Sequence, residues 1–125
     1  MNMILAVAAG GAIGATGRFL VGRLMLKLMG SGFPWGTLSV NIVGSFLIGI
    51  VAGAMASRYS LSHAWQGFLI IGVLGGFTTF SAFSLEIALM IEKHQISTAA
   101  FYSLASVIIG VLALFAGLYA GKTFI

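Results

Sequence analysis

Polar side chains recur at a fixed spacing inside a segment that is otherwise apolar. In "GTLSVNIVGSFLIG", Thr37, Asn41 and Ser45 stand four residues apart, so a helix would place them on one face. Asn41 would then lie roughly 10 Å along the helix from Pro34. Such groups donate hydrogen bonds either to a neighbouring helix or to a ligand in a pore, and the spacing leaves both interpretations open.

A second polar segment, "GGFTTFSAFSLE", is a poor helix former. Gly75 and Gly76 lower helix stability, and the β-branched hydroxyl side chains of Thr78 and Thr79 compete for backbone hydrogen bonds. We therefore predict that the helix containing this segment breaks near its middle. Backbone unwound inside a membrane must be satisfied by protein or water, and its freed carbonyls can coordinate a cation.

Two phenylalanines follow the predicted break. Phe80 and Phe83 are three residues apart and are therefore neighbours on one helical face. The positive edge of an aromatic ring can line an anion pathway without a fixed charge, and the hydroxyl groups of Ser81 and Ser84 lie nearby. Donors of this kind suit a small, strongly hydrated anion, because they replace its water at successive depths. Ordinary packing of the two rings is the alternative.

The composition places these segments in a membrane. Of the 125 residues 60% are hydrophobic and 6% are charged, whereas a soluble domain carries about 25% charged residues. The net charge of +4 comes from scattered cations, which excludes a nucleic-acid-binding stripe, and the lack of cysteine excludes thiol chemistry. No acid, histidine and nucleophile fall together in the pattern, so we do not expect an enzyme.

Four apolar runs predict an all-α membrane protein with one domain, residues 1–125. At about 20 residues per span, the expected helices are 3–27, 35–57, 64–92 and 96–121. An even number of spans puts both termini on one side of the membrane. The cations then divide with little bias, Arg58 and Lys122 on one side and Arg23, Lys27 and Lys93 on the other. This weak bias permits insertion in both orientations, and the thin bundle favours a homo-oligomer.

The first and fourth expected spans carry further informative residues. Gly10 and Gly14 are four apart, a spacing that lets another helix approach closely. Arg18 lies within the hydrophobic pattern, which is costly unless the side chain is paired or reaches an interface. In the fourth span, Tyr102 and Ser106 are four apart and fit either packing or a polar face.

Taken together, these motifs resemble those of the Fluc or CrcB family, the small fluoride channels of microbes. The similar segments are "GGAIGATGR", "PWGTLSVNIVGSF" and "GVLGGFTTFSAFSLE", in this order along nearly the whole chain. The resemblance implies an antiparallel, dual-topology homodimer in the cytoplasmic membrane. It also implies two pores, through which cytoplasmic fluoride leaves passively and fluoride toxicity is relieved.

The resemblance assigns roles to individual residues. Asn41, Phe80 and Phe83 match pore-lining residues of the family. Further pore positions match Ser81, Thr37, Tyr102 and Ser106. The family's structural sodium ion lies at the dimer centre, and its backbone carbonyl ligands match Gly75 and Thr78; no organic cofactor is implied.

The resemblance also matches Arg18 and Glu86 to an arginine and an acid of the family. Two positions depart from its pattern. Gly110 stands where a hydroxyl side chain is often found, and Ala82 stands where threonine is frequent.

Two other functions fit part of the pattern. A proton-coupled exporter of small organic cations also has four short helices, but it needs an acid deep in the first span, where this chain has Arg18. Glu86 is the remaining candidate, and pairing with Arg18 or with an interface is a simpler role for it. A purely structural membrane subunit would explain the glycines but not the polar face or the predicted break.

Overall fold

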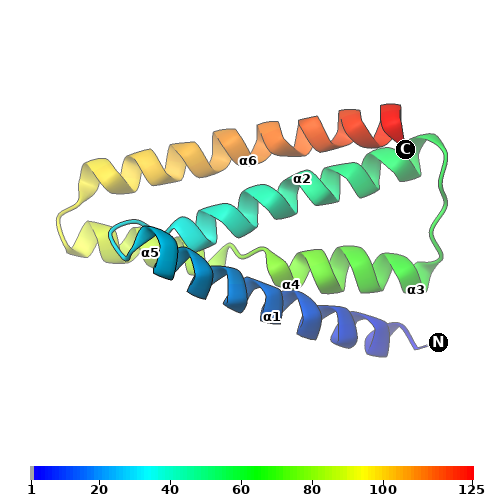
Figure 1. Ribbon diagram of the computed structural model, residues 1–125, viewed down its shortest axis with the longest axis horizontal. Coiled ribbons are helices and arrows are strands. Elements are labelled where there is room, and N and C mark those ends of the chain that lie inside the picture. The colour runs from blue at the N-terminus through cyan, green and yellow to red at the C-terminus, as the bar shows by residue number, and fades with distance from the viewer. Residues whose placement is uncertain (1) are drawn as a thin grey trace.

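The protein is entirely helical in a computed structural model that describes residues 2–125 (Figure 1). The elements are α1 (Met3–Met29), α2 (Trp35–Ser57), α3 (His63–Gln66), η1 (Gly67–Leu74), α4 (Gly75–Phe77), α5 (Ser81–Glu92) and α6 (Ile96–Phe124). The predicted all-α class is confirmed. Both termini lie at the same end of the elongated molecule, where Arg58 Nη1 donates a hydrogen bond to Ile125 O at 3.1 Å (Figure 1).

Four stretches are long and apolar enough to cross a membrane. They are Met3–Met29, Trp35–Ser57, His63–Glu92 and Ile96–Phe124, with mean hydropathies from 1.7 to 2.2. At 1.5 Å per residue, even the shortest, with 23 residues, exceeds the ~30 Å hydrocarbon core. The predicted number of four is therefore confirmed by length and composition.

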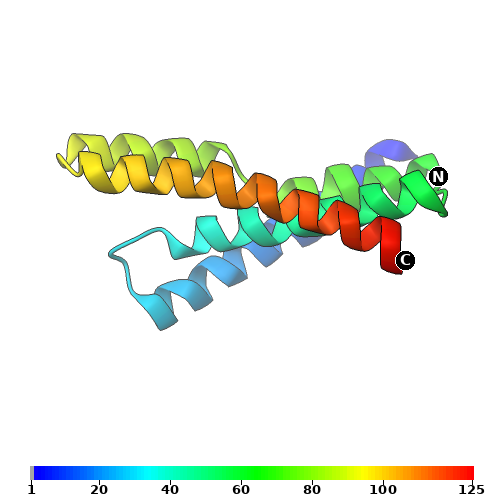
Figure 2. The ribbon, with the colours of Figure 1, turned by 90° about the horizontal axis from the view of Figure 1, so that it is seen from above.

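The helices pack in two close pairs. α6 lies along α2, and α1 crosses η1 and α4 (Figures 1 and 2). Glycine makes both contacts possible because the facing backbones touch. A Cβ atom at Gly49 would lie 3.0 Å from Leu118 N, and one at Gly117 would lie 2.9 Å from Ile50 N. Small residues at four-residue spacing thus set the distance between α2 and α6.

The close approach predicted for Gly10 and Gly14 is confirmed. A Cβ atom at Gly10 would lie 2.9 Å from Val73 N, and one at Gly14 would lie 2.9 Å from Phe77 N. The backbone opposite them differs from the regular helix expected, since η1 has π-helical hydrogen bonding over eight residues. A π-helical turn is wider than an α-helical one, and this segment packs directly against the glycine face of α1.

Substitution of Gly14 by alanine is expected to destabilise the protein by about 1–3 kcal/mol, the usual cost of overpacking. The added methyl group would meet the Val73 carbonyl and the Phe77 amide, which are backbone atoms and cannot rotate away. Gly11→Ala is the matched control, because a Cβ there meets nothing within 4 Å and alanine favours the helix. Thermal unfolding in detergent measures both, and equal midpoints would contradict the expectation.

Candidate functional site

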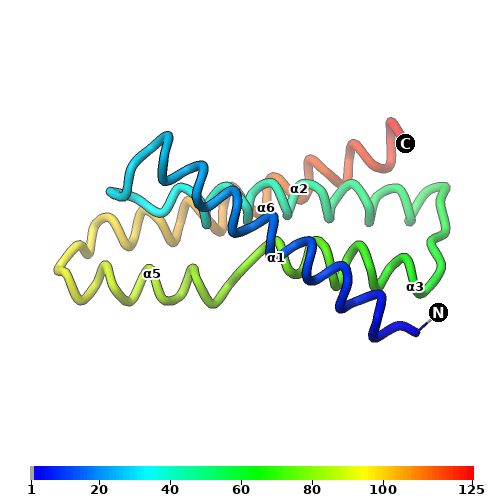
Figure 3. Tube along the Cα trace, turned by 60° about the horizontal axis from the view of Figure 1, so that its bottom comes forward, coloured from blue at the N-terminus to red at the C-terminus, as the bar shows by residue number. Residues whose placement is uncertain are grey.

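The chain is extended between α4 and α5, and two threonines hold this connection (Figure 3). Thr78 has an extended conformation, with φ −87° and ψ 160°, and its hydroxyl donates to Leu74 O at 2.9 Å. The hydroxyl of Thr79 accepts from Ala82 N at 3.1 Å, as a helix N-cap does. Thr78 thus closes the end of α4, whereas Thr79 supports the start of α5.

Asn41, on α2, binds the extended backbone at this connection. Its Nδ2 donates to Thr79 O at 2.9 Å, and its Oδ1 accepts from Thr79 N at 2.8 Å. Of the two interpretations of Asn41, the interhelical hydrogen bond is therefore present. The amide nitrogen keeps a second hydrogen that can be donated elsewhere. The sequence indicated Thr79 only as a residue that helps to break the helix, although any extended residue in a membrane also needs such a partner for its backbone.

The extended connection deprives several carbonyls of their helical partners, and those of Gly75 and Thr78 are two of them. In a continuous helix, Thr79 N–H would bond to Gly75 O and Ala82 N–H would bond to Thr78 O. Thr79 N–H donates instead to Asn41, and Ala82 N–H donates to the Thr79 hydroxyl. The neighbouring Gly76 O accepts from Arg18 Nε at 3.0 Å.

The hydrogen bond to Gly76 O stabilises Arg18 within the apolar helix. Its half-buried side chain crosses from α1 to the backbone of α4. Pairing of Glu86 with Arg18, one of the simple roles considered for the acid, is therefore wrong. Arg18 reaches a carbonyl of the same interrupted segment that Asn41 binds from the other side.

Glu86 is held by hydroxyl groups from two other helices. Thr37 Oγ1, on α2, donates to Glu86 Oε2 at 2.7 Å, and Tyr102 OH, on α6, donates to Glu86 Oε1 at 2.7 Å. Each carboxylate oxygen thus accepts a strong hydrogen bond. Three residues that sequence analysis treated separately meet at one point between α2, α5 and α6.

A row of aromatic rings leads away from this point. The Tyr102 ring is fully buried and lies between Phe33 and Phe83, with ring centroids 5.3 Å and 5.1 Å away in edge-to-face arrangements. Phe80 continues the row, 5.8 Å from Phe83. The Phe80 ring is 78% exposed, so a single chain does not enclose this end of the row.

Two predicted pore residues lie apart from the Glu86 cluster, that is, from Glu86, Thr37 and Tyr102. Ser81 is exposed at the start of α5, with its Oγ 3.3 Å from Thr79 Oγ1. The Ser106 hydroxyl, on α6, is buried and has no hydrogen-bond partner within residues 2–125. A buried hydroxyl of this kind retains its full capacity to donate.

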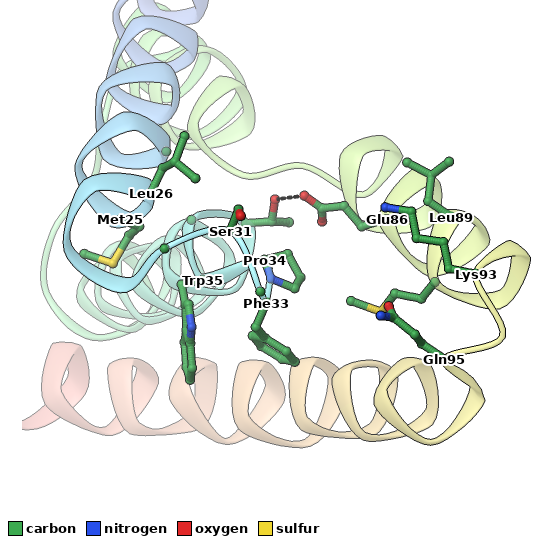
Figure 4. A pocket seen from close by; sticks show the side chains of 16 residues that line it. Met25, Leu26, Ser31, Phe33, Pro34, Trp35, Glu86, Leu89, Lys93 and Gln95 are labelled. Atoms are coloured by element: carbon green, nitrogen blue, oxygen red, sulfur yellow. Dashed lines mark hydrogen bonds between the residues drawn. The ribbon is translucent and has the colours of Figure 1, made fainter.

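A cavity of about 380 Å³ opens beside the Glu86 cluster (Figure 4). It lies where α1 ends and α2 begins, and α5 forms its far wall. Thr37 and Glu86 contribute to the lining, and so does Lys93, at the end of α5. Sequence reasoning treated Lys93 only as a basic residue flanking a helix, since nothing in the local pattern indicates which way its side chain extends.

Four apolar spans define the class of this chain, a multi-pass membrane protein, and the comparisons define its family. A model of the family described as "CrcB-like protein, Camphor Resistance (CrcB)" matches residues 5–118. The chain belongs to this family, as the resemblance of its motifs indicated.

Its relatives are similar over almost their entire length. The chain is 52% identical over 123 residues to the "Fluoride-specific ion channel FluC" of Caulobacter vibrioides (strain NA1000 / CB15N), covering 98% of this chain and 97% of the relative. It is 51% identical over 122 residues to the protein of that name from Agrobacterium fabrum, covering 98% of each. These names describe ion channels, in agreement with the expectation that the chain is not an enzyme.

Proposed function

We propose that this protein is a fluoride-selective channel through which cytoplasmic fluoride leaves the cell passively. The observation that carries the proposal is the identity of about half of all residues, over nearly full length, with relatives named fluoride-specific ion channels. The geometry supports it, because donors without a fixed positive charge gather around the helix interruption. No observation favours the cation exporter, and Glu86, the acid it would use, is held by Thr37 and Tyr102.

Fluoride enters a protein only where hydrogen-bond donors replace its water. The hydroxyl groups of Thr37 and Tyr102 now donate to Glu86, and an arriving fluoride can compete with the carboxylate for them. The positive ring edges of Phe80 and Phe83 continue the series. The second amide hydrogen of Asn41 and the hydroxyls of Ser81 and Ser106 supply further donors.

The direction of transport across the cytoplasmic membrane of a microbe follows from the acid–base chemistry of hydrogen fluoride. Neutral hydrogen fluoride crosses the bilayer, ionises in a less acidic cytoplasm and is held there as the anion. An interior-negative potential favours exit of one negative charge by about 2.3 kcal/mol per 100 mV. A passive pore is therefore sufficient to relieve fluoride toxicity.

We further propose that two copies assemble as an antiparallel, dual-topology homodimer. His63–Glu92 acts as one span, broken at Thr78–Phe80, and the two breaks face each other. In single chains only 11% of the most apolar window of this span is buried, and Gly75 and the Phe80 ring are exposed. A second copy would cover these residues and complete the wall of each pore.

The carbonyls of Gly75 and Thr78 would hold a structural sodium ion at the dimer centre. Both have lost their helical amide partners, and backbone oxygen is a ligand that sodium accepts at interrupted helices. Bound there, the ion would supply positive charge that offsets the carbonyl dipoles of two facing copies.

We expect purified protein in liposomes to pass fluoride and to exclude chloride. A potassium gradient with valinomycin drives anion efflux, and a fluoride or chloride electrode measures it. Equal fluoride and chloride flux would eliminate the selective channel.

The sodium site and the dimer have separate tests. Flux in sodium-free medium should be lower if the sodium site is used, and light scattering in detergent should give the mass of two 13.0 kDa chains.

A further inference from the structure

The cavity beside Glu86 contains a positive charge to which the site described so far gives no role. Lys93 lines this cavity, and Figure 4 shows its side chain extending along α5 toward Glu86. We propose that Lys93 is an anion-recruiting residue, whose charge draws hydrated fluoride into the cavity ahead of the Thr37 and Tyr102 hydroxyls. The inference rests on the proposed function and adds a residue to it.

The negative charge of Glu86 explains why an anion entering the cavity needs a positive residue beside it. Among the residues that line it, Glu86 and Lys93 are the two that carry ionisable groups. The Glu86 carboxylate alone would repel an approaching anion, and the repulsion is strong where low-dielectric walls focus the field. Lys93 follows Glu86 by two helical turns on the same face of α5, so its ammonium group opposes that repulsion at the cavity.

The Lys93 ammonium is also available to an ion. Figure 4 draws a hydrogen bond between Thr37 and Glu86 and none to Lys93, which is an exposed residue. Lysine carries a compact, strongly hydrated charge on a flexible stem. It can therefore attract a hydrated fluoride by its field without binding it firmly enough to slow its passage.

The alternative role of Lys93 is that of an ordinary membrane flank, with its ammonium at the lipid headgroups. Lys27 provides the comparison. It is an exposed lysine in the last turn of α1, near the same cavity, but it does not line it. Removal of one charge at either position changes the net charge of the protein equally.

The test measures fluoride flux into liposomes at about 1 mM fluoride, under one fixed potassium ratio, at low and high ionic strength. The Debye length is about 30 Å in 0.01 M salt and about 3 Å in 1 M salt, so recruitment by charge operates only in the former. Lys93→Gln should reduce flux about three- to ten-fold at low ionic strength, at or below the lower end of the roughly 10- to 1,000-fold range of electrostatic steering, because one charge is removed, and leave it unchanged at high ionic strength. Lys93→Arg should restore the flux, and Lys27→Gln should have a smaller effect than Lys93→Gln.

Three results would overturn the inference. The first is a Lys93→Gln loss that is the same at both ionic strengths, as a structural role would produce. The second is no loss at all, and the third is an equal loss in Lys27→Gln. A wild-type protein that passes no fluoride would instead overturn the proposed function, and the inference with it.

Discussion

Replacement of Asn41 by aspartate is expected to reduce fluoride flux at least ~100-fold. The carboxylate still accepts from Thr79 N, but it cannot donate to Thr79 O, so two oxygens meet where a 2.9 Å hydrogen bond now exists. It also places a negative charge beside the proposed anion pathway. Two like charges 4 Å apart repel by about 4 kcal/mol at an effective dielectric constant of 20, which is more than a hundredfold in rate. The liposome assay measures the loss.

Asn41→Leu separates the charge from the hydrogen bonds. It removes both contacts to Thr79 and adds no charge, so it should lower the unfolding temperature while retaining more flux than the aspartate variant. Size-exclusion chromatography shows whether each variant is folded. Wild-type conduction by a folded Asn41→Asp protein would mean that Asn41 does not lie beside the pathway.

Substitution of Phe80 by isoleucine is expected to reduce fluoride flux about tenfold while the protein stays folded. The ring is 78% exposed in a single chain, so its loss removes little packing within the subunit. Isoleucine retains apolar bulk but has no positive edge, and aromatic edge interactions contribute about 0.5–1.5 kcal/mol. Electrode-measured flux gives the change in rate, and light scattering checks that the mass of the proposed dimer is unchanged.

Phe101→Ile is the matched control for that experiment. Phe101 is also an exposed ring, at 63%, and it neighbours Phe33, at the opposite end of the aromatic row from Phe80. Its substitution should leave flux unchanged. If Phe80→Ile conducts as the wild type does, the Phe80 ring serves packing alone.

Local chemistry in the sequence was sufficient to predict where the helices lie and where their contacts are close. Apolar runs require helices in a membrane because only intrahelical hydrogen bonds satisfy the backbone there. The spacing of Gly10 and Gly14 indicated a close approach, and the backbone of η1 lies against both. Each of these properties depends on residues within a few turns of one another.

The partners of the polar side chains were decided by the tertiary structure. Periodicity shows that Thr37 and Asn41 share a face, but not that one binds the Glu86 carboxylate and the other the backbone of Thr79. Nor does it show that Arg18 reaches Gly76. These contacts join residues 38 to 58 positions apart, and their geometry depends on how the helices cross. A one-dimensional pattern specifies the face of a helix, whereas only packing in three dimensions specifies what that face meets.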